Sequence, residues 1–146
     1  MPDIKIFWDV PQGRGDWQLL GADLATGDDL ATAVLVSLFS DRQADPDDAL
    51  PAGATDRRGW WADTATDRIG SKIWLTTRSK ATADVPNRVR RCVLEALQWI
   101  VDDGVAQTVE ATVAWLRSGV LGTVVTITRR DGTAVALKFD WAWETL

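Results

Sequence analysis

A chain of 146 residues with 46% hydrophobic and 25% charged residues is typical of a folded, water-soluble protein, which excludes a disordered or fibrous one. Its length suits one domain over residues 1–146 with one core. The net charge of −5 argues against nucleic-acid binding, which needs a basic surface, and the absence of histidine removes the commonest general base and metal ligand.

The start of the chain does not have the pattern of a signal sequence. A positively charged beginning followed by an apolar run is missing, and the longest nearly apolar window, residues 30–39, is too short to cross a bilayer. The protein is therefore expected to stay in the compartment where it is made, away from membranes. Its single cysteine, Cys92, falls among the apolar positions of a predicted helix and is expected to act as a small hydrophobic residue.

The first predicted elements are a hairpin and a helix. Ile4, Ile6 and Trp8 mark one mainly apolar face of a strand, and residues 16–20 are its expected partner after a turn at Gly13-Arg14-Gly15. Thr26 and Asp29 have capping-box spacing, with Asp in place of Glu. A helix over residues 28–39 is then predicted by apolar residues at helical spacing: Leu30, Val34, Leu35 and Leu38.

A long polar segment follows, residues 40–70, which we name the crossing. It contains Pro46, Pro51, Gly53 and Gly59, and matches no regular element. Because disordered tracts avoid aromatic residues, its tryptophans favour a packed, irregular loop whose shape resembles an Ω. Residues 71–77 fit a short helix or a strand equally well.

The second predicted helix presents one apolar face, with Pro86 in its first turn and Gly104 just beyond its end. Asp102 and Asp103 lie near its C-terminus, where they oppose the helix dipole and hint at a salt bridge or a cap. The densest basic cluster, on or near this helix, is either a solvated face or a surface for an acidic neighbour. The apolar face is Val89, Val93, Leu97, Ile100 and Val101, and the cluster is Arg88, Arg90 and Arg91.

The rest of the chain reads as three strands. A three-residue loop, Arg130 to Gly132 with Gly132 left-handed, would pair Val135 with Ile127, Leu137 with Val125 and Trp141 with Leu121, so that apolar faces coincide. The predicted fold class is therefore α+β: an antiparallel C-terminal three-stranded meander, to which the N-terminal hairpin is a candidate addition, covered by two or three helices. The last strand, rich in Trp and Phe up to Trp143, is a candidate edge strand for another subunit, although Trp141 and Trp143 also fit a core.

Four stretches, taken in order, resemble the small baseplate protein family of Mu-like contractile-tailed phages: SLFSDRQADPDDALP (37–51), DRRGWWAD (56–63), GSKIWL (70–75) and EALQWIVDDGVA (95–106). The family is distantly similar to the wedge and sheath-initiator proteins of T-even-type phages, whose Glu-Pro-Arg turn this sequence lacks. The resemblance implies a structural protein of the virion tail baseplate, assembled in the bacterial host cytoplasm, with other tail proteins as partners. It implies no catalytic residue, cofactor, metal or small-molecule substrate.

The adjacent Trp60 and Trp61 are the most conspicuous feature of the crossing. Neighbouring side chains in an extended segment point to opposite sides, so we predict that one ring anchors the crossing to the core. The other ring is expected to stack on Arg57 or Arg58 or to contact a partner chain. Arg57, Arg58, Trp60 and Trp61 are therefore the candidate partner-interface residues.

Alternative functions rest on acidic residues. Asp102 and Asp103 are the best candidates for a carboxylate pair in a cell-wall hydrolase, but adjacent residues on a helix point about 100° apart. The acidic run of Asp45, Asp47 and Asp48 departs from calcium-loop spacing and is expected to be solvated. A further alternative is an assembly factor that leaves the finished tail.

Charge is unevenly distributed along the chain. Residues 1–56 carry 3 basic and 11 acidic side chains, whereas residues 57–91 carry 9 basic and 3 acidic ones. Either these segments mix on the folded surface, or the protein has poles of opposite sign that orient it between neighbours.

Overall fold

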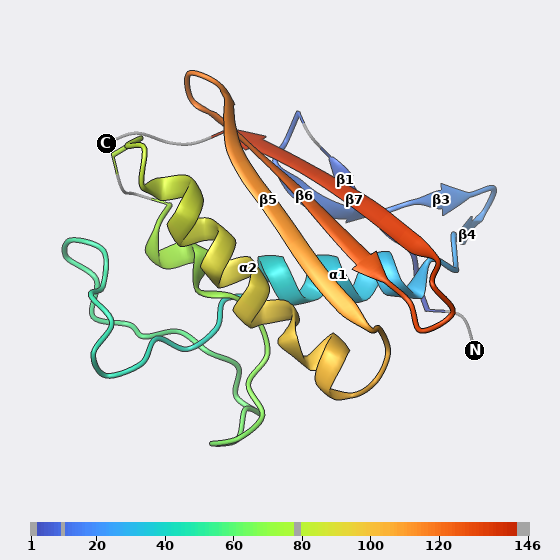
Figure 1. The fold of residues 1–146 in the computed structure, drawn as a ribbon, viewed down its shortest axis with the longest axis horizontal. Coiled ribbons are helices and arrows are strands. Elements are labelled where there is room, and N and C mark those ends of the chain that lie inside the picture. Colours follow the sequence, from blue (N-terminus) through green and yellow to red (C-terminus); the bar gives the residue numbers. More distant parts are fainter. Residues whose placement is uncertain (1–2, 10, 78–79, 143–146) are drawn as a thin grey trace.

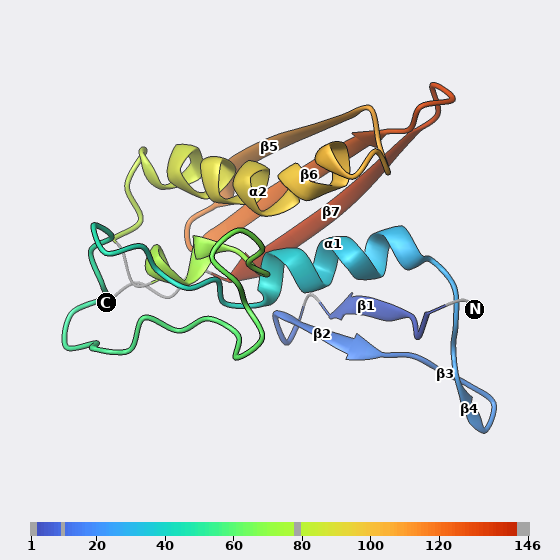
Figure 2. The same ribbon diagram turned by 90° about the horizontal axis from the view of Figure 1, so that it is seen from below.

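The computed structural model describes residues 3–9, 11–77 and 80–142, and it is an α+β fold. A three-stranded sheet carries two helices on one face, and an N-terminal hairpin lies beside the first helix (Figures 1 and 2). The crossing and the loop that joins the last two strands lie at opposite ends of the molecule (Figure 2). In chain order the elements are β1 (Ile6–Asp9), β2 (Arg14–Trp17), β3 (Leu19–Leu20), β4 (Asp23–Leu24), α1 (Asp29–Phe39), η1 (Lys72–Leu75), α2 (Val85–Asp102), β5 (Thr108–Arg117), β6 (Val120–Thr128) and β7 (Ala134–Ala142).

The C-terminal sheet is an antiparallel meander in the order β5-β6-β7, which confirms the predicted architecture. Its register pairs Ile127 with Val135 and Leu121 with Trp141. The Arg129 amide donates to the Thr133 carbonyl at 2.8 Å, so the turn is the predicted three-residue loop, and Gly132 has a φ of 87°. Strand β7 lies at an edge and Trp141 is buried. Trp143 lies outside the described residues.

Helix α2 packs its apolar face onto the sheet. Val89, Val93, Leu97 and Ile100 are each fully buried, and the helix ends at Asp102, before Gly104 with a φ of 73°, as predicted. Cys92 packs against this core, and burial raises the pKa of its thiol, as suits a small hydrophobic residue. Neither helix in the described part of the chain has the length and apolarity needed to cross a membrane.

The basic cluster on α2 is not simply a solvated face. The Arg90 side chain donates from Nε to the Ala111 carbonyl at 2.8 Å, at the outer edge of β5. One of the three arginines therefore covers a sheet edge that would otherwise present a free carbonyl.

Helix α1 forms over the predicted residues, but its N-terminus differs from the predicted capping box. Asp28 precedes the helix in the left-handed region, with a φ of 58°, and its side chain caps nothing. Thr26 instead forms an isolated bridge with Ile4, and the Asp29 carboxylate accepts the Asp3 amide at 3.0 Å. The N-terminal segment therefore binds the Asp29 carboxylate and holds the backbone of Thr26 in a bridge, in place of the predicted cap.

The N-terminal hairpin forms, but its turn comes earlier than predicted. Gly15 pairs with Trp8 inside the β1–β2 ladder, so it is a strand residue, and β2 ends at Trp17. The two strands make a separate sheet and do not extend the C-terminal one. Trp8 links the two, because its ring stacks on Phe39 with centroids 4.0 Å apart and its indole N–H donates to the Asp140 carbonyl at 3.1 Å.

Candidate docking site

The two ends of the crossing meet, which confirms the predicted Ω-like shape. Asp41 and Ser71 form a parallel bridge, and the Ser71 amide donates to the Ser40 carbonyl at 2.9 Å. We call this closure the neck. Gly70 makes it possible, because its φ is 96° and an added Cβ would lie 2.5 Å from the Ser40 oxygen.

Residues 71–77, for which the sequence left a short helix or a strand open, follow the neck and contain a helix. Residues 72–75 form the 3-10 helix η1, and the Ser71 hydroxyl donates to the Leu38 carbonyl at 2.5 Å. Trp74, only 6% exposed, donates its indole N–H to the Arg42 carbonyl at 2.8 Å. The buried aromatic residue that holds the crossing to η1 is therefore Trp74, whereas Ile73 of η1 joins the hydrophobic core.

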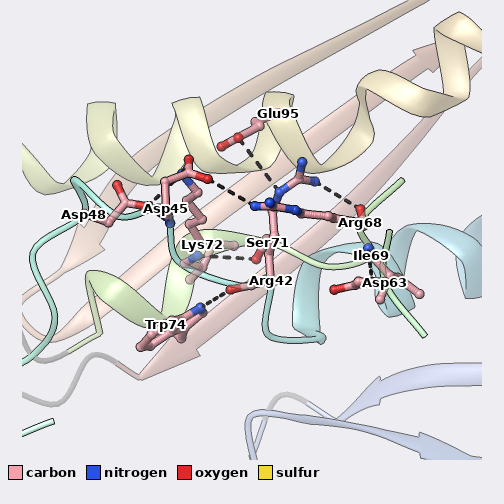
Figure 3. A network of polar contacts seen from close by, with 11 residues as sticks. Arg42, Asp45, Asp48, Asp63, Arg68, Ile69, Ser71, Lys72, Trp74 and Glu95 are labelled. Carbon is pink, nitrogen blue, oxygen red and sulfur yellow. Dashed lines mark hydrogen bonds and ion pairs between the residues drawn. The ribbon is translucent and has the colours of Figure 1, made fainter. Parts of the chain in front are cut away.

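Ion pairs connect the first part of the crossing to its end and to η1 (Figure 3). The Lys72 ammonium contacts the carboxylates of Asp45 and Asp48, the latter at 2.8 Å, and Arg68 contacts Asp45 at 3.2 Å. The expectation that this acidic run is solvated is wrong for Asp45 and Asp48, because basic residues from later in the chain fold back onto them, whereas Asp47 is exposed as expected. Acidic residues of segment 1–56 thus pair with basic residues of segment 57–91, as expected if the two segments mix on the folded surface.

The network shifts the ionisation of its members. Hydrogen bonds from Lys72 lower the pKa values of Asp45 and Asp48 against the opposing effect of burial. Burial disfavours the charged form of Lys72, but hydrogen bonds to both carboxylates outweigh it and raise its pKa. Among the described residues no group of three or more His, Cys, Asp or Glu could hold a metal ion. These carboxylates are therefore occupied in structural ion pairs.

The adjacent side chains of Arg57 and Arg58 point back into the crossing. Arg57 donates to the backbone carbonyls of Asp45 and Pro46, at 2.5 and 3.2 Å. Arg58 forms an ion pair with Asp41 at 2.6 Å, and its guanidinium lies 4.4 Å from the ring centroid of Trp74. Both side chains thus brace the crossing. The predicted stacking of Arg58 on Trp60 or Trp61 is wrong, because its guanidinium lies over Trp74, whereas the alternative, a contact of one of these rings with a partner chain, stays a prediction.

Trp60 and Trp61 both lie at the surface, 51% and 90% exposed, so the predicted inward anchor is wrong. Their rings are 5.4 Å apart and tilted by 53°, in contact with each other. The prediction assumed an extended segment, whereas Gly59 has a φ of 104° and the Asp63 amide closes a turn onto the Trp60 carbonyl at 3.0 Å. This turn places both rings on one exposed tip, residues 58–63.

A surface hollow of about 410 Å³ adjoins the tip. It lies between α1, α2 and the crossing, and its apolar lining includes Trp60, Ile69 and the half-exposed Trp99. The Asp63 carboxylate shapes this edge by accepting the amides of Trp60 and Ile69, at 3.1 and 3.0 Å. Tip and hollow together form an apolar, concave surface suited to binding a protein.

Comparison with known proteins places this architecture in a family. Residues 30–134 match the family model described as phage protein GP46. The chain belongs to the GP46 family. It is 41% identical over 144 residues to the baseplate protein gp46 of Escherichia phage Mu, and 30% identical over 145 residues to the Mu-like prophage FluMu protein gp46 of Haemophilus influenzae; each match covers 98% of both chains.

In this member of the GP46 family the candidate carboxylate pair does not form a site. Asp102 and Asp103 are exposed, Asp102 accepts the Gln98 side-chain amide at 2.9 Å, and Asp103 is the helix C-cap. Neither residue lines the hollow beside the tip. Sequence reasoning pointed to the tip but missed Trp99 and Ile69, since no local pattern shows that two distant segments meet.

Proposed function

We propose that this protein is a non-enzymatic structural component of the baseplate of a contractile phage tail, where it binds other tail proteins. The observation that carries the proposal is the 41% identity, over 98% of both chains, to a protein named as a baseplate protein of phage Mu. The proposed partners are proteins only, without nucleic acid, membrane or small-molecule substrate. The net charge of −5 and the internally paired carboxylates support this choice.

The proposed location is the virion tail baseplate, after assembly in the host cytoplasm. Mass spectrometry of purified tails from the phage that carries this gene is the test. We expect the protein in finished particles, in constant ratio to other baseplate proteins. Its complete absence from assembled tails would contradict the proposal and favour an assembly factor that leaves. Hydrolysis of peptidoglycan by the purified protein would overturn the non-enzymatic assignment.

We propose that the tip contacts a neighbouring protein. Trp60 and Trp61 supply the contact surface, since a tryptophan ring can bury about 150–250 Å² and is enriched among residues that dominate interface energetics. Arg57 and Arg58 hold the tip in place through their contacts within the crossing. A tip that is already ordered loses less conformational freedom when it binds.

A further inference from the structure

The hollow beside the tip continues along α1. A second hollow, of about 520 Å³, shares Ala33 and Trp99 with the first. Because they adjoin at these two residues, we treat them as one groove that follows α1 from Asp28 to Ser37, a length of about 13 Å at 1.5 Å per residue. About two turns of a second helix would fit along it.

The groove has an apolar floor. Ile69 and Trp99 are 37% and 38% exposed, Val105 is 50% exposed, and Ala33 lies between them on α1. The polar atom of Trp99 is already satisfied, because its indole N–H donates to the Ser37 hydroxyl at 3.0 Å. This side chain therefore offers mainly apolar ring surface to an occupant.

The rim of the groove is acidic. Its cations are Arg129 and Arg68, and Arg68 is engaged with Asp45. No salt bridge neutralises the acidic rim residues within the residues that the structure describes. These residues are Asp3, Asp28, Asp29, Asp63 and Asp67.

We propose that the groove binds an amphipathic helix of a neighbouring tail protein, with apolar residues at spacings of three and four flanked by Lys or Arg. This inference rests on the proposed baseplate function and specifies its partner. Two walls of the groove are the helices α1 and α2, whose backbone groups are already paired. In the third wall, the crossing, the amides of Trp60 and Ile69 are bound to Asp63, and no strand lies there, so an inserted strand would find no sheet edge to join. A helix satisfies its own backbone and needs only apolar contact with the floor and opposite charge at the rim.

A second copy of this chain is a poorer occupant. Outside the tip, the most exposed large apolar side chains among the described residues are Leu19 and Leu20, at 70% and 76% exposure, and Asp16 and Asp23 flank them. Inserting them would bring like charges to the acidic rim, which destabilises the contact.

Cross-linking in assembled tails tests the occupant directly. A photo-crosslinking amino acid replaces Ala33 in the groove or, as a control, Ala114 on the exposed face of β5. We expect position 33 to capture a segment of another tail protein with helical apolar spacing and basic flanks, and position 114 not to capture that segment. An acidic or extended segment, a second copy, or no capture at position 33 would overturn the inference. The protein being missing from the tails would instead refute the baseplate function.

The charge requirement has a separate test. With the captured segment as a synthetic peptide, the paired changes Asp28→Asn and Asp67→Asn should weaken binding roughly threefold to tenfold at low salt. The matched control is Asp47→Asn, which removes an exposed carboxylate away from the groove and should leave the affinity unchanged. Equal affinity of all variants would overturn the role of the acidic rim.

Discussion

Lys72 is the residue on which the crossing depends most. Its side chain, 12% exposed, is the only described cation in contact with both Asp45 and Asp48. Without it, two neighbouring carboxylates would repel each other over a partly buried surface. We expect Lys72→Met to lower the free energy of unfolding by about 1–2 kcal/mol at pH 7, a value reduced because Asp45 is half exposed to solvent. Urea denaturation of the variant and the parent measures this difference.

The same ion pairs predict how stability changes with pH. The lowered pKa values of Asp45 and Asp48 contribute stability that is present above the ordinary value of 3.8 and is lost as the pH falls through the lowered values. The raised pKa of Lys72 contributes stability that is complete below 10.5 and is lost as the pH rises through the raised value. Denaturation of the parent and Lys72→Met in parallel between neutral and acidic pH measures the acid side. If both proteins lost the same free energy of unfolding on acidification, the ion pairs of Lys72 would not be the source of this pH dependence.

Replacement of Trp61 and of Trp74 by alanine should have different effects on stability. Trp61→Ala should change the free energy of unfolding by less than about 0.5 kcal/mol, because the ring is 90% exposed. It should reduce incorporation into tails if the tip is an interface. Trp74→Ala should cost about 3–5 kcal/mol, since it removes a buried ring and its hydrogen bond to Arg42. Thermal denaturation together with quantification in purified tails separates the two effects.

At the scale of elements, the neck depends on a glycine. Gly70→Ala should destabilise the protein by about 2–4 kcal/mol, because the added methyl meets the Ser40 carbonyl in addition to the strain of a positive φ. Gly132→Ala is the matched control: its φ is also positive, but its Cβ would meet nothing within 4 Å, so a cost of about 1 kcal/mol is expected. Equal costs at both positions, measured by chemical denaturation, would show that the close approach at the neck contributes nothing.

Regular elements were predictable where one face is buried. The register of β6 and β7 followed from matching apolar faces, because a slip of one residue would expose Leu121 and Val125. The start of α1 was not predictable in the same way. Thr26 and Asp29 had the spacing of a cap, yet their partners lie in the N-terminal segment, at a distance in sequence that no local pattern encodes.

The candidate site was predictable only in part. The crossing and its tryptophans were apparent as an unusual segment, but the orientation of Trp60 and Trp61 depends on a turn at Gly59 that the extended-segment assumption ignored. The groove depends on Trp99 meeting the crossing, a tertiary contact. Local propensity predicts the elements, whereas the site arises from their assembly.

For the whole molecule, we propose that residues 1–146 fold as one unit although the hairpin has its own sheet. Trp8 carries this coupling through Phe39 and the Asp140 carbonyl. Trp8→Ala should lower the free energy of unfolding by about 2–3 kcal/mol and speed amide hydrogen exchange in residues 6–17 more than in residues 108–142. Hydrogen exchange read by mass spectrometry resolves the two segments. Two separate unfolding transitions in the parent protein would contradict a single unit.

The closed neck has an evolutionary consequence. The chain leaves α1 and returns to the same point before η1, so the intervening residues form a loop. The two ends of this loop are held together at the neck. Doubling the length of such a loop adds only about 0.6 kcal/mol of closure entropy. Insertions at exposed positions of the crossing, away from its ion pairs, are therefore expected to leave both helices in place. The surface that we propose as the contact with a neighbouring protein can in this way change while the scaffold is retained.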